Sequence, residues 1–183
     1  MENQKVIYHI VHWLKNYSEQ SGTRGFVIGI SGGIDSALTS TLCAKTGKAV
    51  ICLNMPIHQY KEEYDRGHEH IDWLKKNFPN VNSFEIELTK TFQTMSDVLP
   101  IDLQDWLTMA NTRSRLRMTT LYAIACHNKL LVAGTGNKVE DFGVGFFTKY
   151  GDGGVDVSPI ADLMKSEVFI LAKELGKIGR AHV

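Results

Sequence analysis

The chain has 183 residues, 43% of them hydrophobic, so it is long enough for one well-buried domain and too short for two large ones. Its 20 lysines and arginines balance its 20 aspartates and glutamates, which argues against nucleic acid or an anionic membrane as partner. No stretch resembles a signal peptide or is long enough to span a bilayer, so we expect a cytoplasmic protein. The three cysteines are widely spaced, and we expect all of them to be buried and reduced.

Helical and strand-like segments alternate along the chain. Apolar residues at helical spacing from Ile7 to Leu14 predict an amphipathic helix that ends in the turn-rich segment 18–25. We then expect strands and helices in alternation: strands at 26–30, 49–55, 83–88 and 129–134, and helices at 36–44, 65–78 and 104–127. This order predicts an α/β fold with right-handed crossovers and a mainly parallel sheet that binds ligands at the carboxyl ends of its strands.

No repeat or linker divides the chain, so we expect residues 1–176 to form a single domain. The segment 137–159 is rich in glycine, aromatic and charged residues, and its length predicts a lid over a ligand. We interpret the "HEH" at 68–70 as a solvated helix face rather than a metal site.

The segment "GISGGIDSAL" at 29–38 lies where the first predicted strand turns into a helix. It carries three glycines and two serines: Gly29, Gly32, Gly33, Ser31 and Ser36. Backbone N–H groups freed by glycine, two hydroxyls and a helix N-terminus together predict a phosphate site. The lysine of a Walker A loop is missing, and Asp35 beside a phosphate implies an intervening Mg²⁺. The alternative is a glycine-rich turn whose aspartate only caps a helix.

The hexapeptide "SGGIDS" resembles the pyrophosphate-binding loop of the ATP pyrophosphatase superfamily, whose members adenylate a carboxylate or carbonyl group. Four further segments are similar to NAD synthetase: "NTRSRLRMTTLYAIA", "LVAGTGNKVE", "FFTKYGDGGVD" and "SPIADLMKSEV". The resemblance implies a Rossmann-like, doubly wound fold with helices on both faces of the sheet, of the adenine nucleotide alpha hydrolase type. It also implies that ATP and ammonia convert nicotinic acid adenine dinucleotide (deamido-NAD) to NAD, AMP and pyrophosphate through an adenylated intermediate.

The same resemblance assigns site residues. ATP would contact Gly29, Ile30, Ser31, Gly32, Gly33, Ile34, Asp35, Ser36, Thr135 and Lys165. Asp35 and Glu140 would hold Mg²⁺, with Asp35 and Lys165 as catalytic residues. The dinucleotide would contact Arg115, Lys149 and Asp156.

Helical spacing separates the three neighbouring arginines. Arg113 and Arg117 share one helix face, whereas Arg115 lies nearly opposite, so the three cannot serve one ligand equally. Without the resemblance, the simplest interpretation is a solvated face with Asp102 and Asp105 nearby.

The family resemblance also bears on partners and on the chain ends. We expect a homodimer that builds the dinucleotide site across its interface, formed by the first helix and the arginine-bearing helix. We also expect no amidase domain before the loop, and therefore free ammonia as the nitrogen source. The family continues beyond Gly176, whereas residues 178–183 match a translated sequencing adapter. We therefore expect 177–183 to be a non-native tail on a C-terminally truncated chain.

Two alternatives stay open. One is another pyrophosphate-loop ligase, GMP synthetase-like or tRNA-modifying, although the chain lacks the cysteine pairs or basic surface typical of the latter. The other is an inactive, truncated nucleotide-binding module. Substrate-dependent release of AMP separates an enzyme from such a module.

Overall fold

A computed structural model describes residues 2–176 and is built around one parallel sheet. Its four strands are β1 (Gly25–Gly29), β2 (Ala49–Asn54), β3 (Val81–Glu85) and β4 (Leu131–Val132). They are ordered β3-β2-β1-β4, and every neighbouring pair is parallel. The predicted parallel α/β sheet is therefore confirmed.

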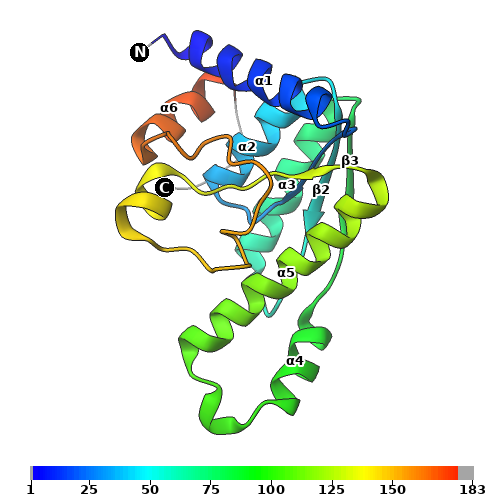
Figure 1. Cartoon of the computed structure of the whole chain (residues 1–183), viewed down its shortest axis with the longest axis vertical. Helices are drawn as coiled ribbons and strands as arrows, with labels where there is room; N and C mark the ends of the chain where they lie inside the picture. Colours follow the sequence, from blue (N-terminus) through cyan, green and yellow to red (C-terminus); the bar gives the residue numbers. More distant parts are fainter. Residues whose placement is uncertain (1, 177–183) are drawn as a thin grey trace.

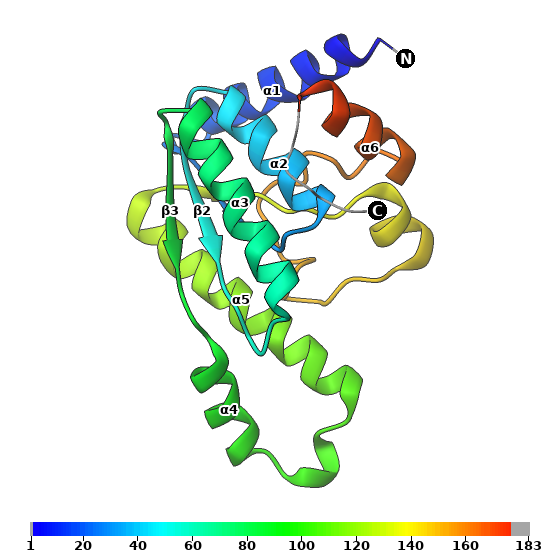
Figure 2. The ribbon, with the colours of Figure 1, turned by 180° about the vertical axis from the view of Figure 1, so that it is seen from behind.

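Helices cover both faces of this sheet (Figures 1 and 2). The α-helices of the described chain are α1 (Asn3–Gln20), α2 (Ile34–Lys45), α3 (Lys61–Asn77), α4 (Thr89–Val98), α5 (Trp106–Asn128) and α6 (Lys165–Glu174). A short 3₁₀ turn, η1 (Ile101–Leu103), and a π-helical segment, η2 (Val139–Val144), complete the regular elements of the described chain.

Alternate residues of β1 point into two separate cores, as the two-residue period of a strand requires. Phe26 and Ile28 pack with α1, α2, α3 and α6 on one face. Val27 packs with Met118 and Leu121 of α5 on the other. Burial on both faces confirms the doubly wound arrangement and explains why the strand segment is apolar throughout.

The predicted first helix is confirmed as α1. Ile7, Ile10 and Leu14 are buried against α2 and α6, which supply the partner surface that the apolar stripe needs. At the other end of the molecule, α4 and η1 extend away from the sheet (Figures 1 and 2). No helix within residues 2–176 combines the length and apolarity needed to cross a bilayer.

The last strand is shorter than predicted. The apolar pattern predicts a strand over 129–134, but regular pairing with β1 covers only Leu131–Val132. The Ala133 N–H still donates to the Val27 carbonyl of β1 at 3.0 Å, whereas the next N–H, of Gly134, donates to the Val157 carbonyl at 2.8 Å. The segment at Val157 therefore pairs with the other edge of β4, beside Thr135.

Two sequence interpretations were wrong. Cys43 and Cys52 are buried as expected, but Cys126 is exposed, because it lies on the outward face of α5 beside the buried Ala125. His70 of the "HEH" segment is buried, because that side of α3 packs on α2 and not against solvent.

Candidate active site

The strand order reverses between β1 and β4, since the chain moves from β1 outward to β3 and then returns to the other side of β1. In open α/β sheets, ligands bind at such a reversal of strand order, beside the carboxyl ends of the two strands. The glycine-rich loop follows β1, and Thr135 follows β4, so both predicted ATP-binding segments lie at this position.

The loop between β1 and α2 depends on glycine for its path. Gly32 has a φ of +82°, and a Cβ there would lie 2.5 Å from the carbonyl oxygen of Glu63. The Ser31 hydroxyl accepts from the Gly33 N–H at 3.2 Å and lies 3.1 Å from the Ser36 hydroxyl. The first backbone N–H groups of α2 have no acceptor within their own helix. Together with the loop before them, they can therefore bind an anion.

Asp35, Glu140 and Lys165 meet beside this loop, although they come from α2, η2 and α6. The Lys165 ammonium donates to Asp35 Oδ2 at 2.5 Å and to Glu140 Oε1 at 3.0 Å. Burial acts to lower the pKa of Lys165, but hydrogen bonds and charge from the two carboxylates outweigh it, and the net pKa is raised. The structure thus brings together three residues that the resemblance assigned to catalysis and metal binding.

Asn137 links the two acids and was missed from the sequence. Its buried side chain donates to Asp35 Oδ1 at 2.9 Å, and its Oδ1 accepts from the N–H groups of Val139 and Glu140. The pKa of neighbouring Asp141 is raised by burial and by repulsion from other carboxylates, Asp35 and Glu140 among them. This corner is therefore rich in negative charge.

The donor set at this corner fits Mg²⁺. Carboxylate oxygens are its preferred protein ligands, and two of them already share one cationic ammonium. Within the described residues there is no cluster of three or more acidic, histidine or cysteine side chains suited to a metal. A cation held by Asp35 and Glu140 would therefore complete its shell with water and phosphate oxygens, as Mg²⁺ commonly does.

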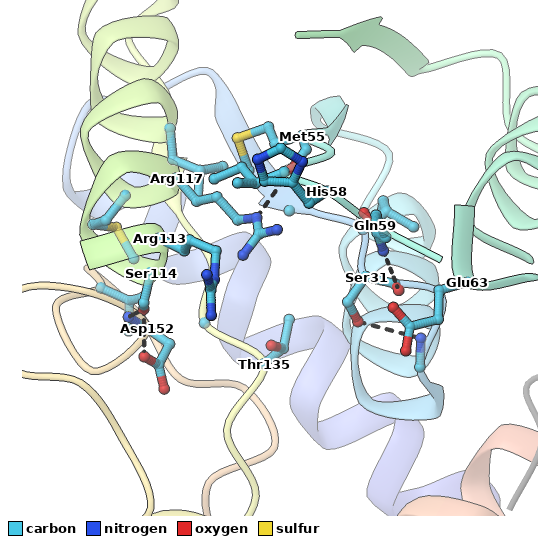
Figure 3. A pocket seen from close by; sticks show the side chains of 18 of the residues that line it. Ser31, Met55, His58, Gln59, Glu63, Arg113, Ser114, Arg117, Thr135 and Asp152 are labelled. Carbon is cyan, nitrogen blue, oxygen red and sulfur yellow. Dashed lines mark hydrogen bonds between the residues drawn. The ribbon is translucent and has the colours of Figure 1, made fainter. Parts of the chain in front are cut away.

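A cavity of about 790 Å³ opens beside the loop (Figure 3). Its walls come from the glycine loop, from Thr135 and its neighbours, from α5 and from the segment 55–60 after β2. The volume lies within the range of small-molecule sites. Of the predicted ATP-binding residues, five line it: Gly29, Ile30, Ser31, Gly33 and Thr135.

Sequence reasoning missed the segment 55–60. Gln59 reaches the loop, where its Nε2 lies 3.5 Å from the Ser31 carbonyl, and His58 projects into the cavity (Figure 3). The signal was available, because the carboxyl end of β2 meets the same sheet edge as that of β1.

The three residues predicted to bind the dinucleotide lie outside the lining of this cavity, along an outward face of α5. Arg115 donates to the Lys149 carbonyl at 3.1 Å. Two turns further along, Tyr122 donates to Asp156 Oδ1 at 3.0 Å, while the Val132 N–H donates to Oδ2 at 2.8 Å. Burial first, and then Asp156, raises the pKa of Tyr122 to about 12. Internal bonds thus hold Asp156 in place.

A parallel sheet with a glycine-rich phosphate loop at its switch point, flanked by an acid–lysine cluster, defines a nucleotide-binding α/β protein. Comparison with known families narrows this class. The family described as NAD synthase matches residues 6–181, and the chain belongs to that family. Its members are ligases that form a C–N bond and use ATP as co-substrate.

Individual relatives agree with this family. The chain is 40% identical over 172 residues to the NH(3)-dependent NAD(+) synthetase of Mycoplasma genitalium, and the aligned region covers 92% of this chain and 67% of that protein. Among solved structures, it resembles an NMN synthetase from Francisella tularensis (TM-score 0.88, 32% identity, 96% of this chain and 71% of the other). It is equally close to an NH3-dependent NAD synthetase from Campylobacter jejuni (TM-score 0.87, 32% identity, 96% and 74%). The predicted non-native tail, 177–183, lies outside the described residues.

Proposed function

We propose that this chain carries out the ammonia-dependent amidation of nicotinic acid adenine dinucleotide in the cytoplasm. The observation that carries the proposal is the junction of the loop 29–36 with Asp35, Glu140 and Lys165 beside a nucleotide-sized cavity, in a member of the NAD synthase family. The family match favours this reaction over that of a GMP synthetase-like or tRNA-modifying ligase.

The reaction has two steps. An oxygen of the nicotinate carboxylate bonds to the α-phosphorus of ATP, and the bond to the bridging oxygen breaks, so pyrophosphate leaves. The nitrogen of ammonia then bonds to the activated carbonyl carbon, AMP leaves with the bonding electron pair, and the nitrogen loses one proton. The products are NAD, AMP and pyrophosphate.

The loop would hold the phosphates that leave. Its free amides and the Ser31 and Ser36 hydroxyls supply donors, and the N-terminus of α2 supplies positive potential. Lys165 would place its ammonium against phosphate oxygens, where negative charge grows as the pyrophosphate departs. Thr135, in the wall of the same cavity, would orient the nucleotide.

Asp35 and Glu140 would hold Mg²⁺, and Asn137 holds the carboxylate of the first and the backbone N–H of the second. The metal, when bound, supplies charge neutralisation at the phosphate oxygens. We assign the two carboxylates the binding and orientation of this cation.

Arg115, Lys149 and Asp156 would contact the dinucleotide from the outward face of α5. This face and α1 carry exposed aromatic side chains, including Tyr8, Tyr17 and Tyr122. A homodimer that covers them would enclose the dinucleotide between two copies of the chain, which keeps the adenylate away from water while ammonia reacts.

The deciding experiment mixes the purified chain with ATP, MgCl₂ and ammonium chloride, with and without nicotinic acid adenine dinucleotide. AMP and NAD formed in equal amounts, and only with the dinucleotide, would support the proposal. Bound ATP without AMP would favour the nucleotide-binding module. Nicotinic acid mononucleotide is the control substrate, because an NMN synthetase has the same fold at the same identity. Amidation of the mononucleotide alone would overturn the proposed substrate.

A further inference from the structure

Arg113 and Arg117 project from one face of α5 into the cavity, because they stand one helical turn apart. Figure 3 shows both guanidinium groups pointing toward the space bordered by Thr135 and by the loop that carries Ser31. Arg115, between them in sequence, points outward to the Lys149 carbonyl. Two of the three arginines of α5 therefore line the cavity.

These two cations are not neutralised by the protein. Within residues 2–176, neither guanidinium forms an ion pair with a carboxylate. Burial first, and then repulsion from Arg113, lowers the pKa of Arg117, while Glu63 across the cavity acts in the opposite direction without reversing the shift. Two like charges held together in a partly buried wall are costly unless an anion joins them.

Few internal bonds hold the pair. Arg117 donates through Nε to the Met55 carbonyl at 3.0 Å, which leaves its terminal nitrogens free for another acceptor. The guanidinium carbon of Arg113 lies 5.1 Å from the centre of the Phe92 ring, a contact that positions the group without using its donors. Guanidinium N–H groups that have no acceptor within the protein can donate in pairs to the oxygens of a phosphate group.

We propose that Arg113 and Arg117 form a second anion subsite, which binds a nucleotide phosphate on the cavity wall opposite the glycine loop. The inference rests on the proposed function, since the phosphate belongs either to ATP or to the dinucleotide. With the loop on one wall and the arginine pair on the other, a nucleotide in the cavity is held at two separated phosphate positions. The subsite is distinct from the outward face that carries Arg115.

The test measures the affinities of ATP and of nicotinic acid adenine dinucleotide separately by calorimetry, so that no turnover occurs. The variants are Arg113→Gln and Arg117→Gln, with Arg113→Lys to restore the charge. Arg24→Gln is the matched control, because Arg24 is exposed and directly precedes β1, at the amino ends of the strands and away from the cavity. Arg113→Gln is the decisive variant, since its side chain makes no hydrogen bond in the described structure and its loss should not impair folding.

We expect at least a tenfold loss of affinity for one of the two nucleotides in Arg113→Gln, recovery to within about threefold in Arg113→Lys, and no change in Arg24→Gln. Loss confined to ATP assigns the subsite to an ATP phosphate, and loss confined to the dinucleotide assigns it to the dinucleotide. Affinities within twofold of the wild type for both ligands would overturn the subsite even if wild-type turnover is normal. Conversely, a wild-type chain that binds both nucleotides but forms no AMP would overturn the proposed function. The affinities of the variants would still show whether the arginine pair binds a phosphate.

Discussion

The ammonium of Lys165 lies 2.5 Å from a carboxylate oxygen of Asp35, although 130 residues separate the two in the chain. It also lies 3.0 Å from Glu140, so one positive charge stands between two negative ones. This is the space in which a metal cation held by the same carboxylates would lie. In the nucleotide-free protein, Lys165 and Mg²⁺ are therefore expected to compete for one position, and ATP phosphates would give the ammonium a different partner.

Replacing Lys165 with methionine tests this competition. We expect Lys165→Met to bind Mg²⁺ at least tenfold more tightly than the wild type without ATP, because the competing ammonium is gone, and to lose at least a hundredfold in kcat. Calorimetric titration with MgCl₂ measures the first effect and AMP release the second. Lys173→Met, on an exposed position of the same helix, is the control. An unchanged affinity for Mg²⁺ would contradict the competition.

The glycine loop offers a second test, through backbone geometry. Gly32→Ala places a Cβ at a φ of +82° and within 2.5 Å of the Glu63 carbonyl, so either the loop or α3 must move. We expect the free energy of unfolding to fall by about 1–3 kcal/mol and ATP affinity to fall at least tenfold. The matched variant is Gly33→Ala, where φ is −90° and the new Cβ meets only the Ser31 hydroxyl at 3.3 Å. Equal losses of stability in the two variants would show that backbone strain at position 32 is unimportant.

Asn137 allows a test of how the acids are positioned. Removing its side chain in Asn137→Ala frees Asp35 from one bond and leaves the amides of Val139 and Glu140 without their acceptor. We expect a loss of about 2–3 kcal/mol in unfolding free energy, measured in urea, and a several-fold higher Mg²⁺ requirement for AMP release. Asn128→Ala removes a single bond, to the Ile124 carbonyl, and should leave the Mg²⁺ requirement unchanged. An equal change in the Mg²⁺ requirement of both variants would contradict the proposal that Asn137 positions the acids.

Local patterns in the sequence predicted much of this molecule. The apolar run before "GISGGIDSAL" predicted β1, the loop and α2, and helical spacing alone placed Arg113 and Arg117 on one face with Arg115 on another. The resemblance to NAD synthetase, rather than any local pattern, joined Lys165 to Asp35. Such pairings depend on how distant segments pack, which spacing along the chain does not encode.

The remaining features escaped prediction for physical reasons. The helix α4 was not predicted from the sequence, and Phe92 is its single buried residue. Asn137 carries no signal of its own, because its role arises only when η2 folds back to Asp35. The pairing of β4 with the segment at Val157 was not predicted, because it joins residues that lie far apart in the chain and carry no local signal for it.

The buried His70 predicts a pH dependence of stability. Its ring is 3% exposed, its Nε2 lies 2.8 Å from the Ser40 hydroxyl, and burial lowers its pKa from 6.5 to about 4. Between those two values the unfolded chain takes up a proton that the folded chain does not, so stability is full above pH 6.5 and falls as the pH drops toward 4. We expect this residue to account for about 2 kcal/mol of lost stability between pH 7.5 and pH 5.

The measurement is urea unfolding of the wild type and of His70→Gln at several pH values in that window. The variant loses stability at pH 7.5 through poorer packing against Trp73, but its stability should change less with pH than that of the wild type. His9→Gln, at an exposed position of α1, should keep the wild-type slope. If His70→Gln and the wild type lose stability in parallel as the pH falls, the acid sensitivity of the fold comes from other groups, and α3 tolerates a charged histidine against α2.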